Sequence, residues 1–300
     1  MTVDSPELLQ TGWQDRSIRE AFRSGAKALS DAGVSNPALD AAVLLGFAAG
    51  IKPDYVLAEG DQPIGTDELH RYGCFISLRC ERMPVSRIIG YREFYSLPFK
   101  VTGDVLTPRP ETETLVQTAV DYLRESGEGG RVLDIGTGSG AIAVTLATLI
   151  PHSRTIALDI SPSALAVASK NANANRVESR VYLCCSDMAD AIFAPRRFDL
   201  VVSNPPYIPA SVFESLPAEV RNGDPELALI AGPTGTEFYG PIARIAMETL
   251  KPNGAVMVEI GQGQDGEVSR ILDCAGFCAV RAIPDLGGIM RVVTGRKPGV

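Results

Sequence analysis

A short segment with polar, proline and aromatic residues, Asn204-Pro205-Pro206-Tyr207, directly follows an apolar stretch at 198–203 that is typical of a buried strand. Two successive prolines fix the backbone and leave carbonyl oxygens without competing N–H groups. The Asn204 side chain carries an acceptor oxygen and an –NH₂ donor, and Tyr207 offers a flat face for stacking. We predict that Asn204, Pro205, Pro206 and Tyr207 hold a planar –NH₂ group, as in an amide or an exocyclic amine, with Asn204 and Tyr207 as the catalytic residues.

A glycine-rich turn follows another apolar stretch, at 131–135, and reads Gly136-Thr137-Gly138-Ser139-Gly140. Glycines let a backbone turn tightly and approach a ligand without interference from a Cβ atom. Together with Ala141, the spacing also satisfies the dinucleotide-binding pattern. The turn alone therefore does not distinguish a dinucleotide such as NAD from S-adenosylmethionine. Its third glycine favours a tighter turn that cups the methionine and ribose of S-adenosylmethionine. Hydride transfer by a dehydrogenase does not need a site that holds an –NH₂ group. The segment 204–207 therefore also favours S-adenosylmethionine.

Further cofactor contacts are expected where the next two strands end. Asp159 is the last residue of the apolar stretch 155–159, where a carboxylate can accept hydrogen bonds from both ribose hydroxyls. Capping of the helix that starts near Ser161 is the alternative role for Asp159. Asp187 and Met188 follow the third strand and are predicted to contact adenine, with a plain loop or capping role for Asp187 left open. The predicted cofactor site therefore comprises Gly136, Thr137, Gly138, Ser139, Gly140, Asp159, Asp187, Met188 and Asn204.

These residues need a sheet to position them, and the chain from Pro108 onward supplies the pattern. Short apolar strands at 131–135, 155–159, 180–184, 198–203 and 255–260 alternate with helical stretches such as 163–173. This alternation predicts a doubly wound, Rossmann-like α/β sheet. Two further strand candidates, 277–283 and 289–294, would close it as an antiparallel pair.

The first third of the chain has a different pattern. Apolar residues recur at helical spacing in 18–29 and 39–47, and glycines and prolines divide the region into short helices. Residues rich in β-branched and aromatic types follow, which favours a hairpin. We therefore predict a helical domain at 1–87, a hairpin linker at 88–107 and an α/β domain at 108–300.

Composition bounds the function. The 300 residues are 45% hydrophobic with a formal net charge of −8, which suits a globular protein and argues against phosphate neutralisation on a nucleic acid. Residues 71–100 nevertheless carry six basic and two acidic residues. They form either a solvated helical face or a docking strip, whose arginines are Arg71, Arg79, Arg82, Arg87 and Arg92.

Localisation and metal content are also constrained. The acidic N-terminus and the lack of an apolar run of roughly 20 residues predict a cytoplasmic protein with no membrane partner. Six cysteines lie at no spacing typical of zinc, so no metal is expected. A metal pair formed by His70 and Cys74 on one helix face is the alternative.

Six segments together resemble the HemK-type protein-(glutamine-N5) methyltransferases, which modify peptide chain release factors: 90–94, 99–101, 105–113, 134–140, 203–208 and 285–291. Segment 105–113, which contains Pro-Arg-Pro-Glu-Thr-Glu, is the most specific, because Asn-Pro-Pro-Tyr also occurs in DNA and RNA adenine methyltransferases. The resemblance implies that the substrate is the glutamine of the Gly-Gly-Gln loop of release factors and that the helical domain helps to dock it. Thr107, Met188, which occupies a position that is often aromatic, and the segment 222–225 depart from the family pattern.

Other functions are weighed against this expectation. A ribosomal-protein glutamine methyltransferase would use the same site. A nucleic-acid adenine-N6 methyltransferase is disfavoured by the net charge and by the short stretch after Tyr207, which leaves no room for a base-reading domain. A non-catalytic nucleotide-binding module would not need the segment 204–207. The expected partner is a release factor, with no direct contact to nucleic acid.

Overall fold

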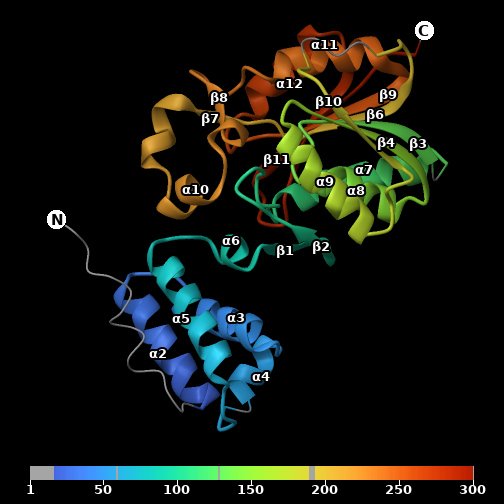
Figure 1. Cartoon of the computed structure of the whole chain (residues 1–300). Coiled ribbons are helices and arrows are strands. Elements are labelled where there is room, and N and C mark those ends of the chain that lie inside the picture. The colour runs from blue at the N-terminus through green and yellow to red at the C-terminus, as the bar shows by residue number, and fades with distance from the viewer. Residues whose placement is uncertain (1–16, 59, 128, 189–192, 300) are drawn as a thin grey trace. The chain divides into compact units, whose positions relative to one another are not determined.

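The computed structural model describes residues 17–58, 60–127, 129–188 and 193–299. The chain forms two compact units (Figure 1). One contains Met1–Gly90 together with Pro217–Gly223, and the other contains Tyr91–Leu216 and Asp224–Val300. Residues 1–16 of the predicted helical domain lie outside the described residues. No helix within the described ranges is long and apolar enough to cross a membrane.

The first unit is helical. Its helices are α2 (Ile18–Asp31), α3 (Pro37–Ala49), α4 (Pro53–Ala58), α5 (Thr66–Cys80), α6 (Val85–Ile89) and α10 (Ala218–Gly223). α2 begins with a capping box, in which the Ser17 hydroxyl accepts from the Glu20 N–H and the Glu20 carboxylate accepts from the Ser17 N–H. Gly50, with a φ of 69°, ends α3 in the left-handed conformation. The buried core includes Tyr72 and Ile76 of α5.

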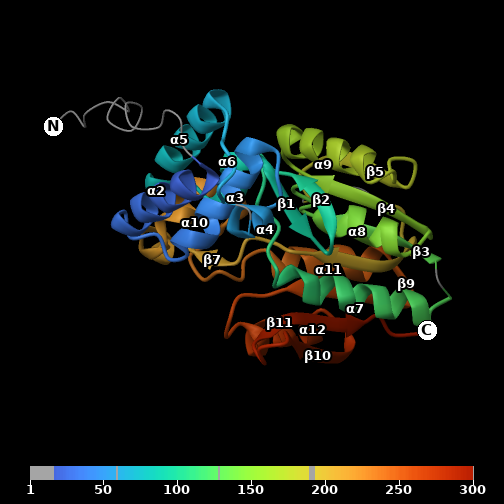
Figure 2. The ribbon, with the colours of Figure 1, turned by 90° about the horizontal axis from the view of Figure 1, so that it is seen from below.

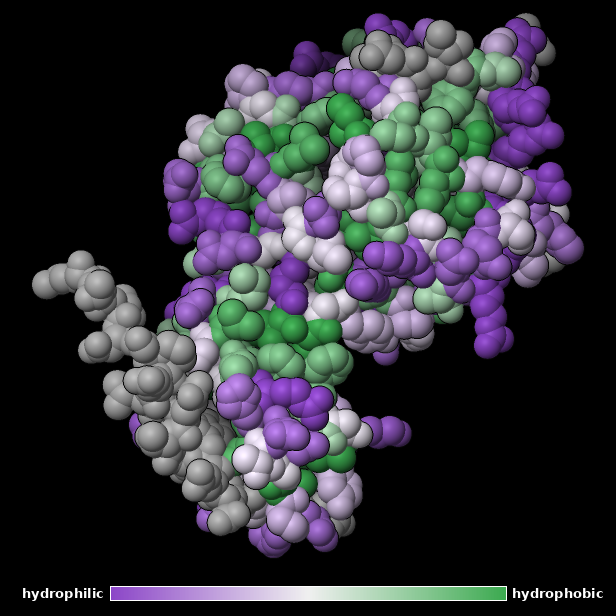
Figure 3. All heavy atoms as spheres, viewed as in Figure 1, coloured by the Kyte–Doolittle hydropathy of each residue, from purple (hydrophilic) through white to green (hydrophobic). Residues whose placement is uncertain are grey.

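Several large apolar side chains of this unit remain exposed. Leu39 is 63% exposed and Phe47 is 51% exposed, both on α3, and Leu57 on the adjoining α4 is 61% exposed. On the face seen in Figure 3, apolar surface also gathers around α6 and the end of α5. Exposed apolar surface of this kind is typical of sites where a protein partner binds.

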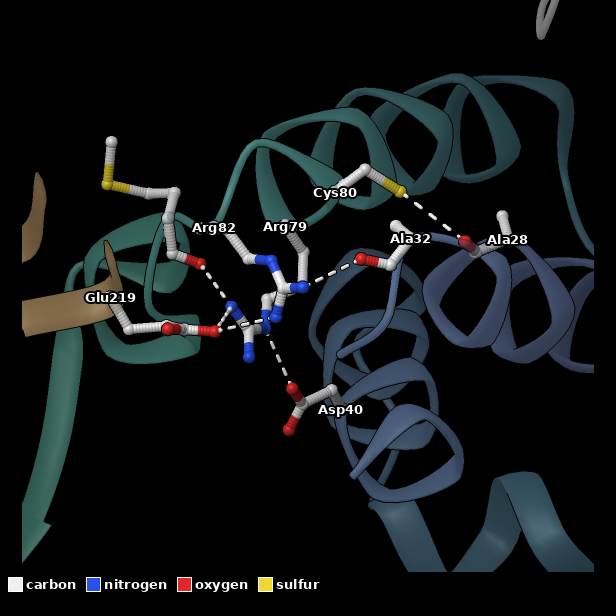
Figure 4. A network of polar contacts seen from close by, with 8 residues as sticks. Ala28, Ala32, Asp40, Arg79, Cys80, Arg82 and Glu219 are labelled. Carbon is white, nitrogen blue, oxygen red and sulfur yellow. Dashed lines mark hydrogen bonds and ion pairs between the residues drawn. The ribbon is translucent and has the colours of Figure 1, made fainter. Parts of the chain in front are cut away.

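A network of ion pairs joins α10 to the other helices of this unit (Figure 4). Arg79, whose side chain is only 6% exposed, donates to Asp40 at 2.8 Å and lies 3.5 Å from Glu219. Arg82 pairs with Glu219 at 3.1 Å and donates to the Ala32 carbonyl at 2.8 Å. A guanidinium can be buried at tolerable cost only when carboxylates and carbonyls compensate it.

This network corrects the expectation of an arginine strip. Arg79 belongs neither to a solvated face nor to an accessible docking surface, because it is buried against two carboxylates. The Arg82 guanidinium also makes its contacts within the unit, with Glu219 and the Ala32 carbonyl. Arg71 pairs with Glu68 one helical turn away, while Arg92 is exposed on the hairpin. The arginines therefore do not share one role.

The second unit is built on a seven-stranded sheet of order β10-β11-β9-β6-β3-β4-β5. Its strands are β3 (Gly129–Ile135), β4 (His152–Asp159), β5 (Val181–Cys185), β6 (Phe198–Ser203), β9 (Leu250–Glu259), β10 (Cys278–Pro284) and β11 (Met290–Arg296). β9, β6, β3, β4 and β5 are parallel, and β11 and β10 add the antiparallel pair. β10 and β5 lie at opposite edges (Figure 2). The predicted Rossmann-like α/β fold is confirmed.

Helices cover both faces of this sheet. α7 (Thr112–Glu125), α8 (Ala141–Leu149) and α9 (Pro162–Ala174) lie on one side, and α11 (Tyr239–Thr249) and α12 (Asp265–Cys274) on the other (Figure 1). Successive strand residues point to opposite faces, so on β3 Val132 joins the core under α7 and α8, whereas Leu133 joins the core under α11. The inner strands β3, β6 and β9 are apolar on both faces because both are covered, whereas Tyr182 and Leu183 of the edge strand β5 are exposed.

A hairpin of β1 (Tyr91–Phe94) and β2 (Leu97–Lys100) opens the second unit. Phe94 and Phe99 anchor it in the core formed with α7 and α8. Asn171 of α9 accepts from the Lys100 N–H at 2.7 Å, donates to the Lys100 carbonyl at 3.0 Å and donates to the Ser139 carbonyl at 2.8 Å. One buried side chain therefore ties the hairpin to the glycine-rich turn.

Candidate active site

The glycine-rich turn lies between β3 and α8 and is held from the neighbouring strand. Gly136, Gly138 and Gly140 all have positive φ values, of 73°, 54° and 80°. Such angles strain any residue with a Cβ atom, which explains the three glycines. The N–H groups of Gly136 and Thr137 both donate to the Leu158 carbonyl of β4, at 2.8 and 2.9 Å. The turn is thus fixed by strand β4 before any ligand binds.

Asp134 supports the turn from beneath. Its Oδ2 accepts from the Thr137 hydroxyl at 2.6 Å. Asp134 is fully buried, and this burial raises the pKa of its carboxyl to about 7. Because it is buried below the turn, Asp134 positions Thr137 rather than offering itself to a ligand.

Asp159 links the turn to the start of α9. Its Oδ2 accepts from the Gly138 N–H at 2.8 Å and its Oδ1 accepts from the Ser161 N–H at 2.9 Å. Ser161 itself is the residue that caps α9, because its hydroxyl accepts from the Ala164 N–H. Each carboxylate oxygen of Asp159 has a second lone pair, so both can still accept a hydroxyl proton.

One cavity of about 390 Å³ collects most of the predicted residues. Volumes of this size are typical of small-molecule sites. The predicted residues that line it are Gly136, Thr137, Gly138, Ser139, Asp159, Asp187, Met188, Asn204, Pro205 and Pro206. Three strand ends of a parallel sheet meet at this edge, which is where α/β folds bind their ligands.

Gly140 and Tyr207 are not among the residues that line this cavity. A Cβ atom at Gly140 would lie 3.1 Å from the Cβ of Ala168, so this glycine allows α8 and α9 to approach each other. The Tyr207 ring packs against Gly261, and its carbonyl accepts from Gln264 at 3.1 Å. Burial also raises the pKa of the Tyr207 hydroxyl, so the phenol stays protonated.

Asn204 is held by a residue that sequence reasoning missed. Its Nδ2 donates to the Thr112 hydroxyl at 3.1 Å, across 92 positions of the chain. Thr112 is buried at the start of α7 and lines the same cavity. Just before Asn204, the Ser203 hydroxyl donates to the Ile135 carbonyl at 2.7 Å, which ties the end of β6 to the end of β3. The Asn204 segment and the glycine-rich turn are therefore fixed to one frame.

Arg109 and Asp224 form a second missed contact at the cavity. The Arg109 guanidinium pairs with the buried Asp224 carboxylate, whose other oxygen accepts from the Thr107 N–H at 2.9 Å. Arg109 belongs to the segment Pro-Arg-Pro-Glu-Thr-Glu that carried the family resemblance, and that was the available signal. Asp224 and Thr107 both lie at departures from the family pattern, and here they contact each other.

Comparisons with known proteins bear on the family of this chain. Residues 111–215 match the model of the methyltransferase small domain, and residues 20–90 match that of the PrmC N-terminal domain. A release factor glutamine methyltransferase of Cereibacter sphaeroides is 41% identical over 93% of this chain and 98% of its own length. The enzyme of that name from Geobacter sulfurreducens is 41% identical over 98% of this chain and 99% of its own.

Among solved structures, the hMettl16 catalytic domain in complex with a 3′UTR hairpin resembles this chain with a TM-score of 0.55. It is 16% identical and covers 76% of this chain and 81% of its own, so the likeness concerns the fold. Fold and site together define a class I S-adenosylmethionine-dependent methyltransferase. Within that class, the chain belongs to the family of release factor glutamine methyltransferases. The resemblance seen in the sequence is confirmed, and the nucleic-acid alternative is not favoured.

Proposed function

We propose that this enzyme methylates the side-chain amide nitrogen, N5, of the glutamine in the Gly-Gly-Gln motif of peptide chain release factors. The observation that carries the proposal is the position of Asn204. Its side chain lines the same cavity as the glycine-rich turn and Asp159, with its Nδ2 engaged by Thr112. That arrangement leaves its carbonyl oxygen for an amide N–H of the substrate. The names of the relatives support the choice of protein substrate.

The residues of the cavity suit S-adenosylmethionine. The turn Gly136–Ser139 would hold the methionine portion, and the free lone pairs of Asp159 would accept the ribose hydroxyls. Asp187 and Met188 would contact adenine. When bound, the cofactor supplies an activated methyl group on its sulfonium. The task left to the protein is to present a nitrogen to it in line.

An amide nitrogen is a poor nucleophile because its lone pair is delocalised into the carbonyl group. The Asn204 Oδ1 and the Pro205 carbonyl would accept its two N–H protons in a geometry that favours a pyramidal nitrogen, which partly restores the lone pair. Tyr207 is given no part in this step, because its ring packs against Gly261 and does not line the cavity. Positioning of the two reacting atoms can supply several kcal/mol of barrier reduction, so no strong base is required. The proton leaves after methylation, when the nitrogen is acidic.

We further infer that the helical unit docks the release factor. Its exposed Leu39, Phe47 and Leu57 supply apolar side chains for such a contact. We place the reaction in the cytoplasm, where peptide chain release takes place.

Incubation with methyl-labelled cofactor tests the substrate class. The enzyme is offered a release factor, a ribosomal protein fraction and an adenine-containing nucleic acid in separate reactions. We expect label in the release factor, located by mass spectrometry on the glutamine of the Gly-Gly-Gln motif. Label on adenine and none on protein would reject the proposed substrate. Label on a ribosomal protein alone would instead indicate a ribosomal-protein glutamine methyltransferase.

A further inference from the structure

Glu259 lies next to the Asn204 segment and was not predicted as a site residue. β6 and β9 are parallel, and their register pairs Ser203 with Val258, so the next residues, Asn204 and Glu259, follow side by side. Glu259 is only 1% exposed. The side chains of Thr112 and Asn204 lie close enough to its carboxyl group to lower its pKa through hydrogen bonding. A chain of polar groups therefore runs from this buried acid to the residue that faces the cavity.

Burying this carboxyl group is costly. Its Oε2 has no hydrogen-bond partner among the described residues. Arg291 compensates part of its charge, whereas Glu111 adds a charge of the same sign. A buried acid with an unpaired oxygen destabilises a fold, so its presence needs another explanation, and such groups are frequent at functional sites.

The explanation lies in the direction of the hydrogen bonds. An ionised carboxylate only accepts, whereas a threonine hydroxyl has one proton and can either give or receive. When Glu259 is ionised, the Thr112 hydroxyl donates to it and is left with acceptor lone pairs. The only group of Asn204 that can satisfy them is its Nδ2, as the 3.1 Å contact shows. The Asn204 Oδ1 is then left for the substrate.

We propose that Glu259 is a positioning residue that sets which end of the Asn204 amide faces the methyl acceptor. The two ends of an asparagine amide have nearly the same shape, so packing alone does not select one. A reversed amide would turn a donor toward the N–H groups of the substrate. The hydrogen bond from the substrate amide to the Asn204 side chain would then be lost. This inference rests on the role proposed for Asn204 and adds to it what fixes the orientation of that side chain.

The orientation depends on the charge of Glu259. The charged and titratable groups that face it are Glu111 before α7, Arg291 on β11, Tyr207 after β6 and Tyr239 on α11. Burial raises the pKa of Glu259 to about 7 and raises the pKa of both tyrosines further above neutrality. A protonated Glu259 can donate to Thr112. The Thr112 hydroxyl can then donate to the Asn204 Oδ1, which permits the reversed amide. Methyl transfer should therefore slow as pH falls through about 7.

Four variants test this in the full chain: Glu259→Leu, Glu259→Gln, Thr112→Val and Thr112→Ser. The readouts are the single-turnover rate at saturating cofactor and substrate between pH 6 and 9, and the Kd for S-adenosylmethionine, which also reports folding. We expect Glu259→Leu and Thr112→Val to slow transfer roughly ten- to hundredfold, as a misplaced reacting group does, with the cofactor Kd unchanged within about threefold. Thr112→Ser keeps the hydroxyl and should transfer near the wild-type rate.

The pH profile separates positioning from simple packing. Wild-type enzyme should lose rate on the acid side, whereas Glu259→Gln should be slower at pH 8 and lose this dependence, because its amide does not titrate. Wild-type rates in both Glu259→Leu and Thr112→Val, or an unchanged acid limb in Glu259→Gln, would overturn the inference. If Asn204→Ala also transfers at the wild-type rate, the proposed amide grip fails as well. If Asn204→Ala is slow while Glu259→Leu is not, only the role of Glu259 fails.

Discussion

Replacing Asp159 by alanine should weaken cofactor binding by an amount that its contacts allow us to bound. The carboxylate already accepts from the Gly138 N–H at 2.8 Å and the Ser161 N–H at 2.9 Å, and it offers its remaining lone pairs to the ribose hydroxyls. Hydrogen bonds to a charged group are each worth roughly 1.5–3 kcal/mol. Loss of one such contribution raises the Kd for S-adenosylmethionine by roughly ten- to 150-fold.

Isothermal titration calorimetry measures this change directly, and Asp199→Ala is a matched control. Asp199 also accepts from a backbone N–H, that of Arg131 at 2.8 Å, and pairs with Lys251. It lies near the start of β6, whereas the cavity lies where the strands end, so its loss should leave the Kd within about twofold. A folded Asp159→Ala protein with unchanged affinity would refute the ribose assignment, and so would an equal loss in Asp199→Ala.

Three further outcomes follow from other parts of the molecule. Arg79→Met should destabilise the helical unit by roughly 1–3 kcal/mol in chemical denaturation, because it leaves the partly buried Asp40 carboxylate without its ion-pair partner, whereas Glu219 keeps Arg82. The exposed Arg71→Met should cost under about 0.5 kcal/mol; equal costs would contradict the network. The Asp134 pKa of about 7 exceeds its unfolded value, so stability falls as pH rises from about 4 to 7. Asp134→Asn should therefore show a smaller fall in Tm between pH 5 and 8 than wild type. An equal fall in both proteins would count against this role of Asp134. Phe47→Ser should raise KM for a release factor with the cofactor Kd unchanged; an unchanged KM would argue against docking there.

Much of the fold could be predicted from the sequence because its signals are local. Each parallel strand of the sheet contains a short apolar run, and Gly136, Gly138 and Gly140 sit where positive φ values are required. Asn204 and Asp159 each follow or end a parallel strand, and such strand ends meet at one edge of the sheet. Local patterns were therefore sufficient to predict many of the residues that line the cavity.

The partners of these residues could not be predicted, because they come from distant parts of the chain. Thr112 and Glu259 reach Asn204 only through the packing of α7 and β9 beside β6, and neither position has a distinctive local pattern. Arg79 was expected near solvent because arginine is usually exposed, yet Asp40 and Glu219 allow its burial. Glu219 belongs to the segment Pro217–Gly223, which lies within the sequence range of the α/β domain but packs with the helices of the first unit.

The central claim is that Asn204 presents a glutamine amide nitrogen to the methyl donor. The direct measurement is single-turnover methyl transfer from saturating S-adenosylmethionine to a release factor, with mass spectrometry to locate the methyl group, in wild type and Asn204→Ala. The variant should keep its cofactor affinity within about tenfold, which is 1.4 kcal/mol, and lose at least about a hundredfold in rate, as expected when one preorganised polar contact to a reacting group is removed. Methylation of the glutamine amide by Asn204→Ala at a rate near that of wild type would contradict the claim.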